Sequence, residues 1–291
     1  MKKLRDIGED ALIRRITEKL GDSGLHTGPG DDCAVVDDGR GPLRLLKTDA
    51  IVEGVHFLRE APASKVGWKA IARVISDFAA MGGEPRHLLV TIALPADLPV
   101  SWVDGLYRGM VRCLSAHGAS LAGGETTSIP DGSPIMISVA GEGAVQRQYC
   151  VLRSGGNPGD VLAVTGTLGG SIRGKHLDFK PRIEEGRRIA RAGATAMMDL
   201  SDGLAKDLPR LTAASRCGFE LIRESVPRSR GCSSEQALSD GEDYELLFSI
   251  PSSRWSKLVL GWPEHLAPIQ AIGRLTAAGG SIDGGWEHFT T

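Results

Sequence analysis

Apolar and polar positions follow two spacings along the first half of the chain, and these spacings predict helices and strands. Apolar side chains recur every three or four positions in residues 7–20, 65–81 and 102–117, which predicts three amphipathic helices. Short apolar runs bounded by glycine, proline or polar residues predict strands at 33–36, 43–46, 87–94, 119–122 and 134–145. We expect strand 43–46 to end at Thr48-Asp49, and strand 119–122 to be broken by Gly123-Gly124-Glu125.

The second half of the chain also alternates strands and helices, but its sequence is not similar to that of the first half. Strands are predicted at 161–165, 195–200, 244–250 and 269–275, and helices at 182–192, 204–216 and 252–260. A polar, glycine-containing stretch at 153–160 precedes the first of these strands and is typical of a connection between domains. Two blocks of alternating strands and helices predict an α/β (α+β) fold with two domains, residues 1–146 and 147–291.

The composition is that of a soluble globular protein. The chain has 291 residues, of which 41% are hydrophobic and 24% charged, and its formal net charge is -2. This charge offers no basic surplus for nucleic acid or an anionic membrane, so we expect neither as a partner. Five scattered cysteines without a CxxC pair predict neither a disulfide framework nor a zinc site. We expect a cytoplasmic protein, because no apolar run resembles a signal peptide or a membrane span.

Acidic residues recur beside glycine at the ends of the predicted elements. They are Asp31-Asp32, Asp49, Asp77, Glu125, Asp199 with Asp202, and Glu242-Asp243. Glycine lets a backbone approach a phosphate group closely, and carboxylates bind hard cations such as Mg²⁺ that bridge phosphate oxygens. Oxygen ligands without paired cysteines and histidines argue against zinc. The recurrence of these acids predicts a carboxylate-rich site for metal ions and phosphates.

Each acid also has a purely structural interpretation. Asp202 could cap the helix that follows it, and Asp77 could pair with Arg73 one helical turn earlier. Asp49, at the end of an apolar strand, needs a cationic partner if it is buried, because an unpaired buried carboxylate is costly. His56 has no second histidine at metal-ligand spacing, and a lone histidine more often packs than reacts. The functional hypothesis therefore depends on the joint recurrence of the acids.

Residues 169–176, Gly-Gly-Ser-Ile-Arg-Gly-Lys-His, come close to the Gly-x4-Gly-Lys-Ser/Thr phosphate loop. His176 stands where that loop has its metal-binding hydroxyl, and no strand of the Walker B type is evident. A glycine-rich entry into a helix is the better interpretation of this segment.

A larger set of motifs resembles one known family. In the first half the matching segments are Gly30-Asp31-Asp32-Cys33-Ala34, Thr48-Asp49, Val52-Glu53-Gly54-Val55-His56-Phe57, Ser76-Asp77 and Ala122-Gly123-Gly124-Glu125-Thr126-Thr127. In the second half they are Arg153, Pro158-Gly159-Asp160, Asp199-Leu200-Ser201-Asp202-Gly203, Gly241-Glu242-Asp243-Tyr244-Glu245 and Gly285-Trp286. In this order they resemble the thiamine-monophosphate kinases, which are part of the aminoimidazole-ribonucleotide-synthetase-like ATP-binding superfamily.

The resemblance implies transfer of the γ-phosphoryl group of ATP to thiamine monophosphate, which gives thiamine diphosphate. It implies that several Mg²⁺ ions are held by Asp31, Thr48, Asp49, Asp77, Glu125, Asp199 and Asp202. ATP would contact Tyr107, Gly124, Glu125, Arg153 and Ser201, and the thiamine phosphate would contact His56, Glu242 and Trp286. The family fold implies an N-terminal domain that binds ATP and Mg²⁺ and whose sheet joins two chains into a homodimer. A C-terminal α/β domain would close over the nucleotide.

These residues suit the implied reaction. The attacking oxygen belongs to a phosphate whose second pKa is about 6, so it is mostly ionised at neutral pH and needs no strong general base. Metal ions between two phosphorylated molecules would reduce their repulsion and leave catalysis to positioning and electrostatics. We therefore predict no side chain as catalytic acid, base or nucleophile.

Three features depart from the family pattern. Lys47 stands where a hydroxyl residue commonly precedes Thr-Asp, so its ammonium could compete with one metal ion. Glu125 replaces a shorter aspartate, and residues 224–238 form a shorter segment than the family has.

Two other hypotheses for the function therefore stay open. The chain could be another ATP-dependent enzyme of the superfamily, such as an aminoimidazole ribonucleotide synthetase, or a nucleotide-binding module that does not transfer phosphate.

Overall fold

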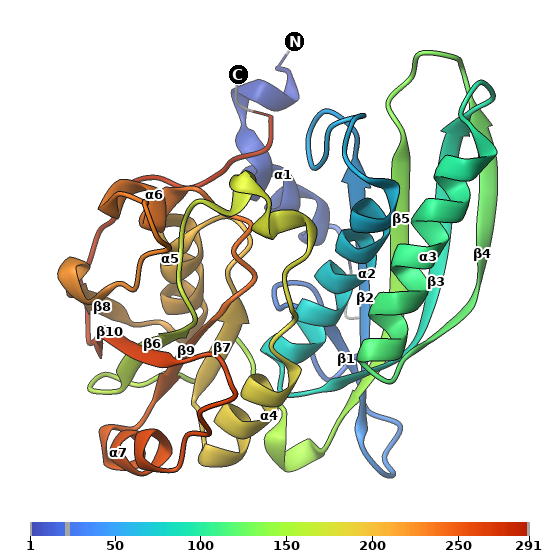
Figure 1. Ribbon diagram of the computed structural model, residues 1–291. Coiled ribbons are helices and arrows are strands. Elements are labelled where there is room, and N and C mark those ends of the chain that lie inside the picture. Colours follow the sequence, from blue (N-terminus) through green and yellow to red (C-terminus); the bar gives the residue numbers. More distant parts are fainter. Residues whose placement is uncertain (1, 21–23, 290–291) are drawn as a thin grey trace.

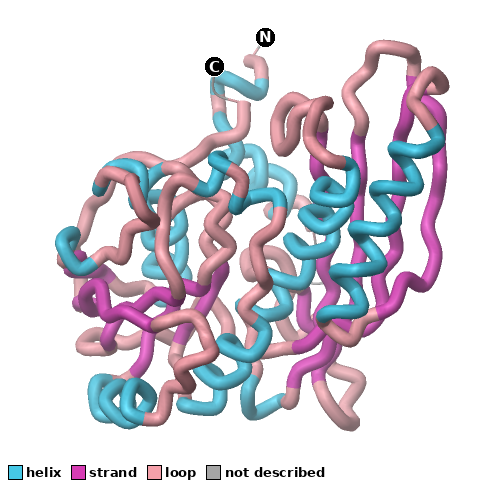
Figure 2. The backbone as a smooth tube through the Cα atoms, viewed as in Figure 1, coloured by secondary structure: helices cyan, strands magenta, loops and turns pink. Residues whose placement is uncertain are grey.

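Two five-stranded sheets, one from each half of the chain, lie on either side of a long central helix, α2 (Figures 1 and 2). This computed structural model describes residues 2–20 and 24–289. The first sheet has the strand order β1-β2-β5-β3-β4, and the second has the order β7-β9-β6-β10-β8. All neighbouring strands are antiparallel except β3 and β4, which are parallel. The predicted mixed fold in two blocks is confirmed.

The first half contains α1 (Gly8–Thr17), β1 (Ala34–Val36), β2 (Leu43–Val52), α2 (Ala63–Ala80), β3 (Glu84–Pro95), α3 (Val100–Ala116), β4 (Ser120–Ile129) and β5 (Met136–Val145). The second half contains β6 (Val161–Thr165), α4 (Ile183–Ala192), β7 (Ala196–Asp199), α5 (Leu204–Ser215), β8 (Gly218–Leu221), α6 (Ser234–Ser239), β9 (Leu246–Ile250), α7 (Ser252–Leu260) and β10 (Ile269–Thr276). Short 3₁₀ turns lie at Leu4–Asp6, Arg147–Tyr149, Ser171–Arg173, Lys175–Leu177 and Arg223–Ser225.

Strands β2 and β4 continue past the residues at which the sequence predicts that they end. β2 does not end at Asp49 but continues to Val52, and β4 is not broken at Gly123 but continues to Ile129. In both cases the neighbouring strand supplies backbone partners, with β5 paired along all of β2 and β3 along nearly all of β4. Backbone pairing across a sheet therefore outweighs the local polar and glycine signals. Local patterns in the sequence do not predict β8 or α6, which are only a few residues long.

Helix α2 forms the centre of the molecule. Most of its residues from Val66 onward are buried, because it packs on β2, β3 and β5 of the first sheet and on β7 and α4 of the second half. Figure 1 shows α2 and α3 on the same face of the first sheet. The opposite, outer face of that sheet exposes apolar side chains such as Leu46 and Leu89.

Within the part of the chain that the structure describes, no helix has both the length and the apolar content needed to cross a membrane. The five cysteines are free thiols.

Helices α2 and α3 pack backbone against backbone at two glycines. A Cβ atom built on Gly109 would lie 1.9 Å from the carbonyl oxygen of Ser64, and one built on Gly67 would lie 2.0 Å from that of Leu106. Real Cβ atoms do not approach backbone oxygens so closely, so the crossing requires glycine on both helices. This crossing positions α2, which carries residues of the candidate site.

We expect Gly109→Ala to lower the free energy of unfolding by about 2 kcal/mol, because the helices must separate to admit the methyl group. Urea denaturation measures this change. Gly261→Ala is the matched control, since a Cβ atom there would make only ordinary contacts, at 3.5 Å with the carbonyl oxygen of Lys257 and at 3.9 Å with Arg188 Nη2. Equal stability of Gly109→Ala and the wild type would contradict the close crossing.

Candidate functional site

Charged side chains of β2 and α2 pair in the space between the two elements. Lys47 and Asp49 lie on the same face of β2, because residues two apart on a strand share a face. Arg73 and Asp77 are one turn apart on α2. Lys47 Nζ lies 2.6 Å from Asp77 Oδ1, and Arg73 Nε lies 3.0 Å from Asp49 Oδ2. Asp49 thus has the cationic partner that its position requires, and Asp77 pairs with Lys47 rather than with Arg73.

Three carboxylates from distant segments converge beside these pairs. Asp32 precedes β1, Asp77 lies in the last turn of α2 and Asp199 ends β7. One oxygen from each lies within 4.8 Å of the others, and all three residues are buried. Arg153 Nη2 donates to Asp32 Oδ1 at 2.6 Å, and Ser76 Oγ donates to Asp199 Oδ2 at 2.7 Å. The second oxygen of Asp32 is buried without a hydrogen-bond partner among the described residues, so a bound cation could satisfy it.

Burial and mutual repulsion raise the pKa of the acids gathered here. Burial, with repulsion from Asp32, raises the pKa of Asp199 to about 6 and that of Asp31 to about 6. The pKa of Asp77 rises well above its usual value, mainly through burial and against the attraction of Lys47. These carboxyl groups therefore gain from a nearby cation, which favours their charged form.

A cavity of about 800 Å³ opens beside the three carboxylates. Its walls include the predicted site residues Asp49, Asp77, Arg153, Asp199, Ser201 and Asp202, together with Lys47, Arg73, Lys206 and Arg210. Helix α1 also lines it, and Asp10 of that helix lies 2.9 Å from Arg210 Nη2 of α5. The mixture of carboxylates and fixed cations suits a ligand that carries both phosphate groups and metal ions.

A smaller cavity of about 240 Å³ adjoins the first. The two share Arg73, Ser201, Asp202, Tyr244 and His288. The smaller cavity contains all three residues implied for the thiamine phosphate, namely His56, Glu242 and Trp286. The ring of His288 lies between two of them, with centroids 5.9 Å from His56 and 6.2 Å from Trp286.

Lys69 of α2 holds two of these residues in place. It is fully buried, and its Nζ lies 2.6 Å from Glu242 Oε1 and donates at 2.6 Å to the carbonyl oxygen of His56. Burial lowers the pKa of Lys69 to about 8. His56 Nδ1 accepts a hydrogen bond from Val52 N at 3.1 Å. Burial, with repulsion from Arg73 and Lys69, lowers the pKa of His56 to about 3, so its imidazole is neutral at physiological pH.

Asp202 does not cap α5. The N-cap position is Gly203, and Asp207 Oδ2 accepts hydrogen bonds from Ser201 N and Asp202 N at 3.1 and 3.0 Å. The carboxylate of Asp202 instead accepts from Arg210 Nη1 at 2.6 Å on the wall of the larger cavity. The capping interpretation is therefore wrong.

Asp31 lies beside the cluster, where its Oδ2 accepts from Arg153 N at 3.0 Å. Thr48 alternates with Asp49 along β2, so its side chain lies on the outer face of the sheet and lines a different cavity. Its hydroxyl is therefore not beside the three carboxylates within this chain.

Tyr107, Gly124 and Glu125 are not among the described residues that line the two adjoining cavities. Tyr107 on α3 packs against the core of the first half. Gly124 and Glu125 lie on β4, at the far edge of the first sheet. Three strand spacings, about 14 Å, separate β4 from β2. Within one chain, the implied ATP contacts thus fall into two groups. Arg153 and Ser201 line the larger cavity, and the other three residues lie away from it.

The segment 169–176 does not form a phosphate loop. Gly169 N donates to both carboxylate oxygens of Asp243, at 3.0 and 2.9 Å, and Gly170 N donates to Asp240 at 2.8 Å. Lys175 Nζ donates to Glu245 Oε1 at 3.0 Å. Carboxylates of the chain itself thus occupy the donors that a phosphate would need. Two short 3₁₀ helices follow the glycines, so the glycine-rich segment enters helical turns of the 3₁₀ type.

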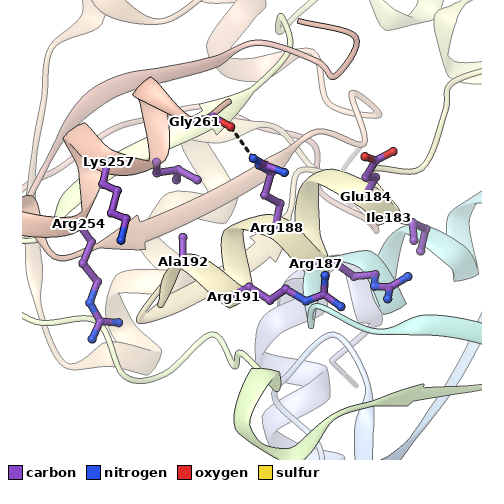
Figure 3. Close-up of a pocket in the computed structure, with 10 residues that line it drawn as sticks. Ile183, Glu184, Arg187, Arg188, Arg191, Ala192, Arg254, Lys257 and Gly261 are labelled. Atoms are coloured by element: carbon purple, nitrogen blue, oxygen red, sulfur yellow. Dashed lines mark hydrogen bonds between the residues drawn. The ribbon is translucent and has the colours of Figure 1, made fainter. Parts of the chain in front are cut away.

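A third cavity, of about 830 Å³, lies against α4 and α7 and is lined by basic side chains (Figure 3). Contacts within the chain engage most of them. Arg187 lies 3.2 Å from Glu84, Arg188 donates to the carbonyl oxygen of Gly261, and Arg191 lies over the ring of Tyr149. The structure thus directs these guanidinium groups toward different partners, and none of the predicted site residues lines this cavity.

Three features of the site are not predicted from the sequence: the roles of Lys69 and His288, and the place of Asp32 among the three buried carboxylates. Lys69, Arg73 and Asp77 recur at intervals of four in an otherwise apolar helix, and this polar stripe is a signal that could have identified Lys69. For the Asp31-Asp32 pair, the sequence does not decide which carboxylate enters the cluster.

Comparison with known proteins identifies the family. The family models for the N-terminal and C-terminal domains of AIR synthase related proteins match residues 30–145 and 157–283. The thiamine-monophosphate kinase of Rhodopirellula baltica is 35% identical over 289 residues, which cover 93% of this chain and 89% of that protein. The thiamine-monophosphate kinase of Aquifex aeolicus is 35% identical over 324 residues, which cover 99% of this chain and 100% of that protein.

Solved structures agree with these relatives. The structure of AaThiL complexed with AMPPCP and TMP has a TM-score of 0.88 and 33% identity, and it covers 99% of each chain. The crystal structure of thiamine monophosphate kinase from Aquifex aeolicus has a TM-score of 0.81 and 32% identity, and it covers 97% of this chain and 98% of that one. The chain therefore belongs to the thiamine-monophosphate kinase family, within the AIR synthase related proteins.

Proposed function

We propose that this protein transfers the γ-phosphoryl group of ATP to a phosphate oxygen of thiamine monophosphate and releases ADP and thiamine diphosphate. The observation that carries this proposal is the junction of two cavities, one beside three buried carboxylates and one containing His56, Glu242 and Trp286. Direct transfer requires donor and acceptor to lie in adjoining sites. The relative AaThiL binds AMPPCP and TMP together, which supports the same pairing of ligands here.

The residues present fit Mg²⁺. Asp32, Asp77 and Asp199 offer oxygen ligands close to one another, and the buried oxygen of Asp32 lacks a hydrogen-bond partner among the described residues. We propose these three as ligands, together with the residues that the family resemblance implies: Asp31, Thr48, Asp49, Glu125 and Asp202. When bound, Mg²⁺ would neutralise charge on the phosphate oxygens of the two substrates.

The side chains of the protein would bind and orient the substrates. Arg153 and Ser201 line the larger cavity, where we propose that they contact ATP. Glu242 would attract the positively charged thiazolium ring, and Trp286 offers an aromatic face to the same cation. The neutral imidazole of His56 would supply a hydrogen bond rather than take a proton, because its pKa is lowered to about 3 by burial and nearby cations.

We also propose that the active form is a homodimer joined through the outer face of the first sheet. Leu46 and Leu89 on that face are 39% and 50% exposed, and they line a cavity of about 620 Å³ with Thr48. Exposed apolar surface of this kind is typical of a protein interface. We propose that Glu125 and Asp77 serve one nucleotide site from different chains, because the strand that carries Glu125 lies about 14 Å from β2 within one chain. A cytoplasmic location stays a prediction from the composition.

A nucleotide-binding module that does not transfer phosphate is the second candidate, since Lys47 already neutralises part of the carboxylate cluster. The two functions differ in one measurement, which is formation of thiamine diphosphate in a single turnover with ATP, Mg²⁺ and thiamine monophosphate. Nucleotide binding without product would favour the module.

We expect Asp77→Asn to slow single-turnover phosphoryl transfer by about 100-fold or more, because it removes charge stabilisation at the reacting phosphates. Asp38→Asn is the control, since Asp38 pairs with Arg44 at 2.7 Å on the surface. Near wild-type turnover of Asp77→Asn would disprove the metal assignment.

Without metal ions, we expect Asp199→Asn to be more stable than the wild type at pH 7.5, by about 3 kcal/mol, and nearly equally stable at pH 3.5. In the folded wild type the pKa of Asp199 is raised to about 6, above its value in the unfolded chain. The folded state therefore binds the proton more tightly, and the free energy of unfolding falls as pH rises from about 4 to 6. The variant has no carboxyl group at position 199 and does not show this fall. Thermal unfolding across this pH range measures the difference. Added Mg²⁺ should stabilise the wild type more than the variant, and a pH-independent difference would contradict the shift.

We expect chains with Asp77→Asn and chains with Glu125→Ala to be inactive alone but to regain about a quarter of wild-type activity when co-expressed. Half of the resulting dimers are mixed, and each mixed dimer has one intact site of two if the sites are shared between chains. Assay of the co-purified mixture measures this recovery. Absence of recovery, with mixed dimers present, would show that both residues act within one chain.

A further inference from the structure

We propose that the ammonium group of Lys47 is a built-in cation of the carboxylate cluster and takes the place of one divalent ion. This inference rests on the proposed function for its metal ions and deepens it. It predicts that the wild-type chain binds one divalent ion fewer than a chain in which residue 47 is uncharged.

The position of the ammonium group supports this assignment. Lys47 Nζ lies 2.6 Å from Asp77 Oδ1, which is the distance of a charge-assisted hydrogen bond. Asp77 is also one of the three residues whose oxygens lie within 4.8 Å of one another. A divalent ion held by the same carboxylate would lie close to the ammonium group and be repelled by it.

The surroundings show that Lys47 is part of the site and not only a surface ion pair. Its side chain is 24% exposed, Asp77 is 7% exposed, and both line the larger cavity. Together with Arg153, which lies 2.6 Å from Asp32, it places two positive charges against the three carboxylates. The cluster therefore keeps a smaller negative charge than its carboxylates alone would give, and it needs fewer added cations.

A fixed ammonium group differs chemically from a metal ion. It donates hydrogen bonds to phosphate oxygens as a point charge, and it stays attached when free Mg²⁺ is scarce. It cannot, however, bind several oxygen ligands in an octahedral arrangement as Mg²⁺ does. Lys47 would thus act as a positioning residue for phosphate oxygens in the larger cavity.

The test counts Mn²⁺ ions bound per full-length chain by titration, with free Mn²⁺ measured by electron paramagnetic resonance. We expect Lys47→Thr and Lys47→Met each to bind one ion more than the wild type, and Lys47→Arg to bind the wild-type number. Lys65→Thr is the control, because Lys65 pairs with Asp178 at 2.7 Å between exposed side chains. Circular dichroism establishes folding of each variant before titration.

An unchanged count in both Lys47→Thr and Lys47→Met would overturn the proposal. A gain in Lys47→Thr alone would also overturn it, because the new hydroxyl would then be the cause. If Lys47→Thr or Lys47→Met does not fold, the ion count of Lys47→Arg is the test. One ion more in Lys47→Arg than in the wild type would contradict a role for the positive charge. Absence of thiamine diphosphate formation by the wild type would reject the proposed function without changing the ion count, so the two failures are distinguishable.

Discussion

Repulsion among buried carboxylates is the constraint on which this structure depends. Asp32, Asp77 and Asp199 are far apart in sequence, yet one oxygen from each lies within 4.8 Å of the others. Such a cluster is costly unless cations accompany it. Lys47 and Arg153 supply two positive charges from the chain itself. These two charges do not balance the three carboxylates. The remaining negative charge makes the cluster suitable for divalent ions, which in turn bind phosphate groups.

Helix α2 connects this electrostatic arrangement to the packing of the whole molecule. Its apolar residues fill the space between the two halves. Of its polar stripe, Arg73 and Asp77 line the adjoining cavities, and the buried Lys69 lies behind Glu242 of the smaller one. One helix thus positions the carboxylate cluster at its C-terminal end and the wall of the smaller cavity through Lys69. The close crossing with α3 at Gly67 and Gly109 keeps this helix in one place.

Local sequence signals predicted most elements but not all of their ends. Helix α7 and strand β6 have the predicted bounds, because apolar spacing and flanking prolines or glycines act locally. The strands β2 and β4 continue past polar and glycine residues, because a neighbouring strand satisfies their backbone groups. Such a neighbour is distant in sequence, and no local pattern reveals it.

The sequence by itself determined the mixed fold, the family and the acids that recur beside glycine. Only the tertiary structure decided how these acids are used. It brought Asp32, rather than Asp31, into the group of three carboxylates, paired Lys47 with Asp77, and left Glu125 three strands from β2. The physical reason is that charge pairing and ion binding depend on distances of a few ångströms between segments, and these distances are set by the packing of α2 between two sheets.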